Sequence, residues 1–227
     1  MISTLNGKNI LVTAGSTRGY LDAVRFITNI STGRLSQEIA MEALVHGAHV
    51  TYVHGKGSVV PEIEECSDIM PYHLELIEIE TNKDLEDTFQ LSLRNRNFDV
   101  IVHAMAVADY VPDERQSDKI SSENEELIIK LVKTRKVINI IRNIWPESYL
   151  VGFKLVVQKR REELLQIAQD FLTQSAADLI IANDSRDISD KRHVAYFVCN
   201  NLEMTNLFCS KKEIANGLIH HLEQQVR

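Results

Sequence analysis

Polar side chains that suit an anionic ligand lie between the first predicted strand and the first predicted helix. Residues 9–13 read as a buried strand and residues 14–19 as a glycine turn, yet the next amphipathic helix opens only near residues 31–34. The intervening stretch carries these polar residues: Arg25, Asn29, Ser31 and Thr32. A nucleotide-binding fold normally passes from strand to helix through a short loop, with a phosphate on the helix N-terminus. This opened junction indicates an anionic substrate where a dinucleotide would usually sit.

Each residue of the junction has a chemical reading and an ordinary structural one. Arg25 suits bidentate phosphate binding, and the Asn29 amide can hold a carboxylate or a tetrahedral centre without adding charge. The hydroxyls of Ser31 and Thr32, with the free amides at Gly33, can bind phosphate. The ordinary readings are a surface salt bridge for Arg25, a turn residue at Asn29 and a helix cap at the helix start.

Three predicted strand ends hold further candidates, because ligands of parallel sheets bind beyond the carboxyl ends of the strands. They are the turn with Gly15, Ser16 and Thr17, the segment 104–110 after strand 98–103, and the segment 182–184 after strand 178–182. In the second segment Ala104 and Ala106 permit close approach of a ligand, and Asp109 can accept hydrogen bonds from a ribose or base. Tight packing of helix on sheet explains the alanines equally well.

Residues 110–124 form a polar segment without periodicity, and it is long for a connection inside a compact domain. Such loops are often lids or binding loops, although a solvated loop is the alternative. Lys119 lies within this segment, where a lid would bring it over a triphosphate. Lys133 belongs to an alternating lysine face that is ordinarily solvated, and His103 at a strand end reads as structural.

The remaining pattern alternates strands and helices, which predicts a three-layer, Rossmann-like α/β domain with a mostly parallel central sheet. The predicted helices are 33–46, 83–95 (capped by Asn82), 135–145, 162–172 and 211–225. The other predicted strands are 49–53, 74–80, 127–131 and 149–154, with a C-terminal hairpin of 194–199 and 204–208. Residues 54–71 read as a loop. No domain boundary is evident, so residues 1–227 are expected to form one domain.

Composition places the chain among ordinary globular proteins. It has 227 residues, 44% hydrophobic residues and a formal net charge of −7, which argues against general nucleic-acid binding. Its three cysteines lack Cys-x-x-Cys spacing, which fits a reducing compartment and argues against a zinc site. With neither a signal peptide nor a membrane span recognisable, we expect a cytoplasmic location.

Taken in order, these segments resemble the phosphopantothenate–cysteine ligase family in its stand-alone bacterial form. The strongest match is the insert Asp22–Gly33, and any other single segment is weak. The other matching segments are 13–18, 106–110, 118–120, 133–134, 151–154 and 177–184. The resemblance runs from residue 10 to about residue 198.

The resemblance implies a two-step ligation in coenzyme A biosynthesis. The carboxylate of 4′-phosphopantothenate would attack a nucleotide α-phosphate, and the amine of L-cysteine would then attack the acyl-nucleotidylate. CTP is expected in preference to ATP, with Mg²⁺ on the triphosphate. The family pattern also implies a homodimer and a separate phosphopantothenoylcysteine decarboxylase acting downstream.

The family match also implies roles for individual residues. Asn29 would hold the acyl-nucleotidylate and assist the second step, and Lys119 on a flap would neutralise the α-phosphate region. The nucleotide site would comprise Gly15, Ser16, Thr17, Ala104, Ala106, Asp109, Lys133, Phe153 and Lys154, with Phe153 against the base. The acyl substrate would contact Arg25, Ser31, Thr32 and Gly33.

Two departures from the family pattern affect the expected nucleotide site. The usual proline after the Lys-Thr pair is replaced by Arg135. The positions of two lysines on a later helix are taken by Phe171 and Ser175. We expect Lys154 to compensate for those lysines.

A rival interpretation is an NAD(P)-dependent short-chain reductase, whose glycine turn resembles residues 13–19. Such an enzyme needs a late Tyr-x-x-x-Lys pair, and this spacing occurs only at Tyr52 and Lys56. A non-catalytic nucleotide-binding protein is a second alternative, and turnover would discriminate it from the ligase.

Overall fold

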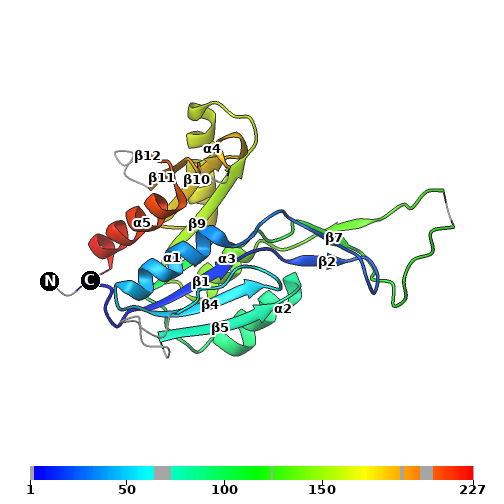
Figure 1. The fold of residues 1–227 in the computed structure, drawn as a ribbon, viewed down its shortest axis with the longest axis horizontal. Coiled ribbons are helices and arrows are strands. Elements are labelled where there is room, and N and C mark those ends of the chain that lie inside the picture. Colours follow the sequence, from blue (N-terminus) through cyan, green and yellow to red (C-terminus); the bar gives the residue numbers. More distant parts are fainter. Residues whose placement is uncertain (1–2, 64–72, 124, 190–191, 200–206, 227) are drawn as a thin grey trace.

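An eight-stranded sheet forms the centre of the computed structural model, which describes residues 3–63, 73–123, 125–189, 192–199 and 207–226 (Figure 1). The strand order is β12-β11-β10-β9-β6-β1-β4-β5. The strands are β1 (Asn9–Ala14), β4 (His49–Gly55), β5 (Leu74–Ile79), β6 (Val100–His103), β9 (Tyr149–Val156), β10 (Leu179–Asp184), β11 (Ala195–Val198) and β12 (Leu207–Phe208).

The sheet is parallel from β5 to β10, and only β11 and β12 run antiparallel to their neighbours. In the centre Ile10 of β1 pairs with Val50 on one side and with Val100 on the other. The carboxyl ends of six strands therefore meet at one edge of the sheet. The predicted α/β class with a mostly parallel sheet is confirmed.

Five α-helices cover the two faces of the sheet in the described ranges. They are α1 (Arg34–Val45), α2 (Asn82–Asp87), α3 (Val137–Ile144), α4 (Arg161–Ser175) and α5 (Lys211–Gln225). A π-helix, η2 (Thr88–Leu93), continues α2, and η3 (Ser185–Asp187) is a short 3₁₀ turn. The expected continuous helix 83–95 thus changes its hydrogen-bond pattern after its first turns.

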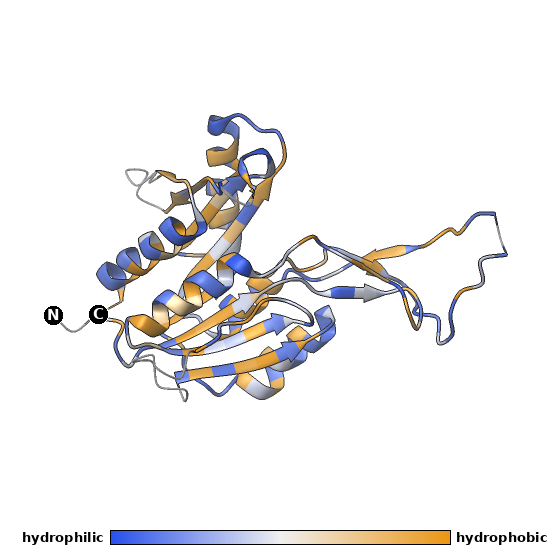
Figure 2. Ribbon diagram, viewed as in Figure 1, coloured by the Kyte–Doolittle hydropathy of each residue, from blue (hydrophilic) through white to orange (hydrophobic). Residues whose placement is uncertain are grey.

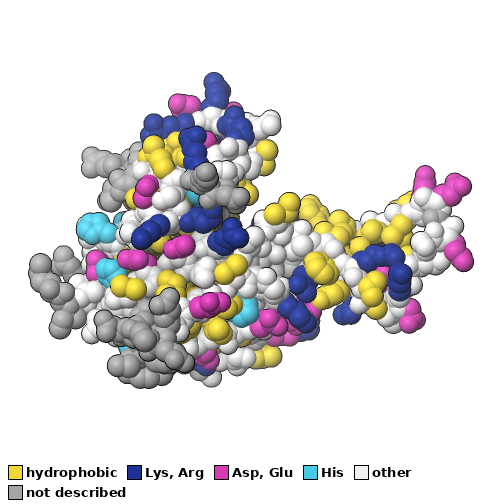
Figure 3. Space-filling view, viewed as in Figure 1, with side chains coloured by type: hydrophobic (Ala, Val, Ile, Leu, Met, Phe, Trp, Pro, Cys, Tyr) yellow, Lys and Arg dark blue, Asp and Glu magenta, His cyan; other side chains and the backbone are white. Residues whose placement is uncertain are grey.

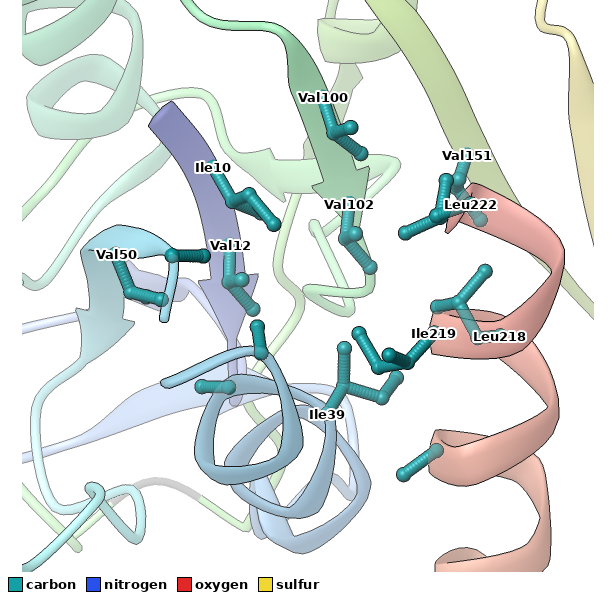
Figure 4. Packing of buried hydrophobic residues seen from close by; sticks show 14 of the residues in the cluster. Ile10, Val12, Ile39, Val50, Val100, Val102, Val151, Leu218, Ile219 and Leu222 are labelled. Atoms are coloured by element: carbon teal, nitrogen blue, oxygen red, sulfur yellow. The ribbon is translucent and has the colours of Figure 1, made fainter. Parts of the chain in front are cut away.

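Alternation along the buried strands divides the core into two clusters. In β1, Ile10 and Val12 pack toward α1 and α5, whereas Leu11 belongs to the cluster on the face covered by α3 and α4. Figure 4 shows valines and isoleucines of the strands pointing at Ile39 of α1 and at the leucines of α5. Strands buried on both faces are consistent with the continuous apolar runs in the sequence.

A long arm leaves the carboxyl edge of the sheet (Figure 1). It contains two antiparallel ribbons, β2 (Arg18–Tyr20) with β3 (Phe26–Thr28), and β7 (Tyr110–Pro112) with β8 (Leu131–Lys133). Figure 2 shows many apolar residues along it. The sequence predicted a turn and an irregular insert for the first ribbon.

Two strand and loop predictions near the arm are corrected. Residues 127–130 form no strand, because β8 begins only at Leu131, where it pairs with Pro112. Conversely Tyr110–Pro112, predicted as loop, is β7. The segment 127–133 is rich in Leu, Ile and Val on both sides of Lys130, so its composition does not say which part finds a partner strand.

Smaller corrections concern caps and loop ends. Thr81, not Asn82, caps α2, with a capping box to Asp84. His54 and Gly55, predicted as loop, end β4, and residues 64–72 of that predicted loop lie outside the described residues. The C-terminal hairpin is present as β11 and β12, although residues 204–206 of its second predicted strand also lie outside the described residues.

A polar cluster at the root of the arm ties it to the sheet. The Tyr20 hydroxyl donates to the Glu80 carboxylate, which also pairs with Lys56. The backbone N–H of Arg18 donates to the Glu80 carbonyl at 2.7 Å, and its guanidinium donates to the Lys56 carbonyl at 2.7 Å. The hairpin is thus fixed at its base by both backbone and side-chain bonds.

The two ends of the described chain meet away from the arm (Figure 1). The Ser3 hydroxyl donates to the Glu223 carboxylate at 2.6 Å, and the Thr4 hydroxyl donates to the Glu223 carbonyl at 3.0 Å. Among the described helices, none is both long and apolar enough to cross a lipid bilayer.

Candidate functional site

Close backbone packing shapes the carboxyl end of β1. Gly15 has a φ of 74°, and a Cβ there would lie 1.7 Å from the Ser58 Oγ. A Cβ on Gly55, at the end of β4, would lie 2.1 Å from the Ser16 carbonyl oxygen. Glycine is required at both positions, because a side chain would displace the turn that holds Ser16.

The amides of the segment Ala104–Asp109 are held by the first strand and its turn. The Met105 N–H donates to the Thr13 hydroxyl at 3.1 Å, and the Ala106 N–H donates to the Gly15 carbonyl at 2.8 Å. The Ala108 N–H donates to the Thr17 hydroxyl at 2.9 Å. Thr13 and Thr17 are fully buried, so these bonds are shielded from water.

Three side chains hold the carbonyls of the same segment. The Asn29 Nδ2 donates to the Ala106 and Val107 carbonyls at 3.3 and 3.1 Å. The Ala108 carbonyl accepts from the Asn82 Nδ2 at 2.8 Å and from the Thr134 hydroxyl at 2.7 Å. The segment is therefore clamped from both sides, and we call residues 104–109 the clamped segment.

His103 lies directly below the clamped segment and is structural, as its position predicts. Its Nδ1 lies 2.9 Å from the Thr13 hydroxyl oxygen, and the side chain is buried. Burial lowers the pKa of His103 to about 4, so the ring is neutral at pH 7.

Asp109 ends the clamped segment and is exposed, as a ligand-binding carboxylate would need to be. Its Oδ1 pairs with the Lys136 Nζ at 2.7 Å, and its backbone carbonyl accepts from the Thr134 N–H at 2.9 Å. Lys133, also predicted to bind the nucleotide, is exposed on β8.

The junction between the arm and α1 lies beside the turn after β1. Gly33 is the N-cap of α1 with a φ of 79°, and a Cβ there would lie 3.3 Å from the Gly15 nitrogen. Ser31 and Thr32 precede it, and the Thr32 carbonyl accepts from the Val59 N–H at 3.0 Å. Because α1 has no side-chain cap, its first amides retain hydrogen-bonding capacity for a ligand.

The structure therefore brings many of the predicted site residues to one edge of the sheet. Those that meet near the turn after β1 are Gly15, Ser16, Thr17, Asn29, Gly33, Ala104 and Ala106. Those after β1 and β6 meet because the two strands are parallel neighbours, whereas Asn29 is brought there by its bonds to the Ala106 and Val107 carbonyls.

Arg25 and Lys119 lie away from this edge of the sheet, on the arm. Arg25 sits in the turn of the β2–β3 hairpin, where its guanidinium contacts Asp22 at 3.5 Å and donates to the Ile120 carbonyl at 3.3 Å. Lys119 is exposed and precedes Ile120, whose N–H donates to the Asp22 carboxylate at 3.1 Å. Both are therefore at the turn end of the hairpin, whereas Asn29 is at its root.

Asp22 organises that turn of the arm. Its buried carboxylate accepts from the N–H groups of Val24 and Arg25 at 2.8 and 2.7 Å. Burial opposes ionisation, but these bonds, the Ile120 N–H and the nearby guanidinium together hold the pKa of Asp22 below its ordinary value. Arg25 is thus part of a structural ion pair in this chain.

Phe153 and Lys154 lie on β9 and face opposite sides of the sheet. Phe153 packs against the cluster under α1 and α5. The Lys154 Nζ lies 5.0 Å from the centre of the Phe171 ring on α4. Lys154 thus contacts Phe171, one of the two positions where the family pattern has lysine.

Sequence reasoning missed three residues that hold the clamped segment. They are Thr13, Asn82 and Thr134, whose side chains bond its backbone. Thr13 shows a sequence signal, because it is a polar residue at the end of an otherwise apolar strand. Asn82 and Thr134 show no such signal in the sequence, since a helix cap and an ordinary loop residue would account for them equally well.

Comparison with known proteins places the chain in one family. A family model described as the DNA/pantothenate metabolism flavoprotein C-terminal domain matches residues 5–226. The coenzyme A biosynthesis bifunctional protein CoaBC of Thermococcus kodakarensis is 31% identical over 223 residues, covering 98% of this chain and 53% of that protein. Its Methanocaldococcus jannaschii counterpart is 27% identical, covering 97% and 52%. The chain thus spans about half the length of these curated relatives.

Solved structures agree with this placement. The DNA/pantothenate metabolism flavoprotein from Streptococcus pneumoniae has a TM-score of 0.84 and 33% identity, covering 96% of this chain and 100% of that one. The C-terminal domain of a CoaBC protein has a TM-score of 0.74 and 26% identity, covering 97% and 96%. With the family model matched over nearly the entire sequence, this chain belongs to the family of DNA/pantothenate metabolism flavoprotein C-terminal domains.

Proposed function

We propose that the chain is a phosphopantothenate–cysteine ligase that joins 4′-phosphopantothenate to L-cysteine in coenzyme A biosynthesis. Its similarity to the CoaBC proteins supports this pathway. We further propose that residues 1–227 act as one ligase domain. The arrangement that carries the proposal is the clamped segment facing Asn29 and the uncapped start of α1.

A carboxylate is a poor acylating agent at neutral pH, so a phosphoester leaving group must first be installed. The 4′-phosphopantothenate carboxylate attacks the nucleotide α-phosphorus and pyrophosphate leaves. The cysteine amine then attacks the acyl carbon, the nucleoside monophosphate leaves, and the amine loses a proton. Neither step needs a covalent bond to the protein, so catalysis is positioning and charge stabilisation.

The clamped segment suits that task because its backbone is fixed before a ligand arrives. Small side chains at Ala104 and Ala106 leave room for a nucleotide, and Asp109 offers a carboxylate to a ribose. Gly15, Ser16 and Thr17 line the same edge of the sheet. Ser31, Thr32 and Gly33 take the acyl substrate at the start of α1. Arg25 pairs with Asp22 at the turn end of the hairpin, away from Asn29 of the same chain. We therefore propose that any contact of Arg25 with the substrate is made in the site of a second subunit.

Asn29 is proposed to hold the carbonyl of the acyl-nucleotidylate. Its Nδ2 is engaged with the Ala106 and Val107 carbonyls, so the side chain ties the acyl site to the nucleotide site. Replacement by Asp removes the donor and adds a negative charge near the phosphate. We expect Asn29→Asp to slow the cysteine-dependent step more than nucleotidylate formation, and equal loss of both half-reactions would contradict the role.

The nucleotide is proposed to be CTP in preference to ATP, arriving with Mg²⁺ on its phosphate oxygens, which are ligands that this ion prefers. Phe153 and Lys133 are proposed to contact it. Lys154 is proposed to replace the missing lysines of α4, since its ammonium lies over Phe171. Unchanged nucleotide affinity in Lys154→Ala would rule out that replacement.

A homodimer is proposed from the surface of the arm. Several large apolar side chains of the arm are exposed, among them Ile30 to 103% and Ile128 to 90%, and an exposed apolar patch marks a site of association with another protein surface. We propose that Lys119, which lies at the far end of the arm from Asn29, serves the site of a second copy. Mixing inactive Lys119→Ala and Asn29→Ala proteins should then restore about a quarter of wild-type activity, because half of randomly mixed dimers hold one intact site. No recovery in mixed dimers would place Lys119 outside the partner's site.

The deciding experiment combines the protein with 4′-phosphopantothenate, L-cysteine and Mg²⁺, and tests CTP and ATP separately. Pyrophosphate release that depends on 4′-phosphopantothenate, followed by cysteine-dependent product, is the expected outcome. Failure to release pyrophosphate with either nucleotide would overturn the assignment.

The rival reductase lacks a usable catalytic pair. Tyr52 is fully buried, its hydroxyl donates to the Val59 carbonyl at 3.1 Å, and burial raises its pKa. Lys56 pairs with Glu80. In addition, the glycine turn leads into β2, not into a helix that could receive a pyrophosphate.

A further inference from the structure

Asp109 lies where the clamped segment passes into the arm. The next residue, Tyr110, begins β7 and pairs with Lys133, the last residue of β8. Isolated two-stranded ribbons are marginal in water, so movement of this ribbon would pass directly to Asp109 unless its backbone were held. The carboxylate proposed to bind a ribose thus lies at the boundary between the sheet edge and the arm.

Hydrogen bonds hold the peptide groups on both sides of Asp109. The Ala108 carbonyl accepts from the Asn82 Nδ2 at 2.8 Å and from the Thr134 hydroxyl at 2.7 Å. The Asp109 carbonyl accepts from the Thr134 N–H at 2.9 Å. Because peptide groups are planar, fixing both of them sets the φ and ψ of Asp109. Asn82 and Thr134 therefore determine the direction in which the Asp109 side chain leaves the backbone.

Asn82 is not required as the cap of α2. Thr81 is the N-cap, and it forms a capping box with Asp84. Asn82 is 8% exposed, and its Oδ1 has no hydrogen-bond partner in the described part of the chain. A buried amide oxygen without a donor costs free energy, so a residue that served stability alone would be expected to satisfy both ends of its amide. The bond from Asn82 to Ala108 thus indicates a role in placing the clamped segment.

The loop that carries Thr134 is tied to α2 and to Asp109. Arg135 pairs with Glu86 of α2 at 2.5 Å, and Lys136 pairs with the Asp109 Oδ1 at 2.7 Å. Figure 3 shows Lys and Arg together with Asp and Glu side chains on the surface where α2 lies at the base of the arm. Charges of both signs are consistent with ion pairs between these elements, but exposed pairs contribute little. Asp109 is therefore held mainly by the hydrogen bonds to its flanking peptide groups.

We propose that Asn82 and Thr134 are positioning residues that aim the Asp109 carboxylate at the ribose of the nucleotide and isolate it from movement of the arm. The inference rests on the proposed function, since that function assigns Asp109 to a ribose. A ribose hydroxyl would donate to a carboxylate oxygen, and such bonds are strong but weaken steeply when the donor angle is poor. A small rotation of the Asp109 backbone would therefore weaken nucleotide binding, even though neither positioning residue contacts the nucleotide.

The experiment measures binding of CTP, ATP and their 2′-deoxy and 3′-deoxy analogues to the full chain by calorimetry, with Mg²⁺. In the wild type, the analogue that lacks the hydroxyl bound by Asp109 should bind about ten-fold more weakly than its parent nucleotide. Thr134→Val replaces only a hydroxyl by a methyl group, and it should reduce this preference to about three-fold or less by weakening the parent nucleotide. Thr134→Ser keeps the hydroxyl and should match the wild type.

Two further variants test whether the effect passes through Asp109. Asn82→Ala should lower the preference as Thr134→Val does, and Asn139→Ala, at an exposed asparagine of α3, is its matched control. Asp109→Asn should remove most of the preference by itself. Adding Thr134→Val to Asp109→Asn should then cause no further loss, because residues that act through one group are not additive. If Asn82→Ala unfolds the chain, the isosteric Thr134→Val still tests the proposal.

Other results would overturn the inference. Equal weakening of parent and deoxy nucleotides in Thr134→Val would indicate a general distortion of the site, and an unchanged preference would remove the positioning role. Additive losses in the double variant would show that Thr134 acts independently of Asp109. A wild type that binds nucleotide without distinguishing the ribose hydroxyls would remove the ribose from Asp109. Only the absence of CTP and ATP binding to the wild type would overturn the proposed function as well.

Discussion

The clamped segment and the arm differ in how their positions are secured. Residues 104–109 are held by hydrogen bonds from β1, Asn29, Asn82 and Thr134, over a buried core. The arm consists of two-stranded ribbons and the loops that join them, and large apolar side chains are exposed on both, Tyr110 of β7 at 55% and Ile128 of a loop at 90%. Isolated two-stranded ribbons are marginal in water. The sheet edge is thus rigid by itself, whereas the arm relies on its root and on whatever covers its apolar side.

The largest effect on the sheet edge is expected from Gly55→Ala. The new Cβ would meet the Ser16 backbone, which cannot rotate away, so overpacking should lower the free energy of unfolding by about 3 kcal/mol. Urea denaturation measures it. Gly7→Ala is the control, since its Cβ meets nothing within 4 Å and only its φ of 75° should cost about 1 kcal/mol. Equal losses in the two variants would contradict the close packing of Gly55.

Acidification should weaken the base of the clamp through His103. Its pKa is about 4 in the folded protein and 6.5 ordinarily, so the unfolded chain binds the proton more readily between these values. Stability should therefore fall as the pH drops from 6.5 to 4, by at most about 3 kcal/mol from this residue. Denaturation midpoints of wild type and His103→Asn across this range measure the contribution. Parallel pH profiles would show that His103 is not the source.

Thr17→Val in the clamp and Thr28→Val at the root of the arm together compare the stability of the two regions. The loss of its hydroxyl leaves the buried Ala108 N–H without an acceptor, which should cost about 2 kcal/mol. Thr28→Val removes an exposed hydroxyl that donates to the Thr17 carbonyl and should cost about 0.5 kcal/mol. A larger loss at Thr28 would reverse the ranking of the two regions.

The smallest effect on the folded chain is expected from Ile128→Lys on the arm. The side chain is 90% exposed, so the free energy of unfolding of the monomer should change by less than about 0.5 kcal/mol. Self-association, measured by sedimentation, should nevertheless weaken at least ten-fold. Glu126→Lys, an exposed charge change nearby, is the control. Unaltered association in Ile128→Lys would exclude this part of the arm from the interface.

The same contrast explains what the sequence could predict. The strand 9–13 and the helix 33–46 were recognisable because buried strands and one-sided helices leave local apolar patterns. The strands β2 and β3 were missed, since three-residue strands are too short to show alternation. β8 was misplaced because its register depends on Tyr110–Pro112, a partner distant in sequence.

Site residues follow a similar rule. The candidates at strand ends were predictable from topology, and Gly15, Ser16 and Ala106 do lie together. The position of Lys119 was not predictable from the sequence. The direction of the arm is set by hydrogen bonds between residues distant in sequence, such as that from the Tyr20 hydroxyl to the Glu80 carboxylate. Asn82 resembled a cap, and only the fold shows that it bonds Ala108.

The meeting of the chain ends at Ser3 and Glu223 has a practical consequence. A short glycine–serine linker could join the ends, and new termini could be opened at the exposed residues Ser121 and Ser122 without cutting the central sheet. Such a circular permutant would keep the strand order of the central sheet, and its new termini would lie on the arm. It would turn the arm into an attachment point for labels or fused domains, far from Ser3 and Glu223.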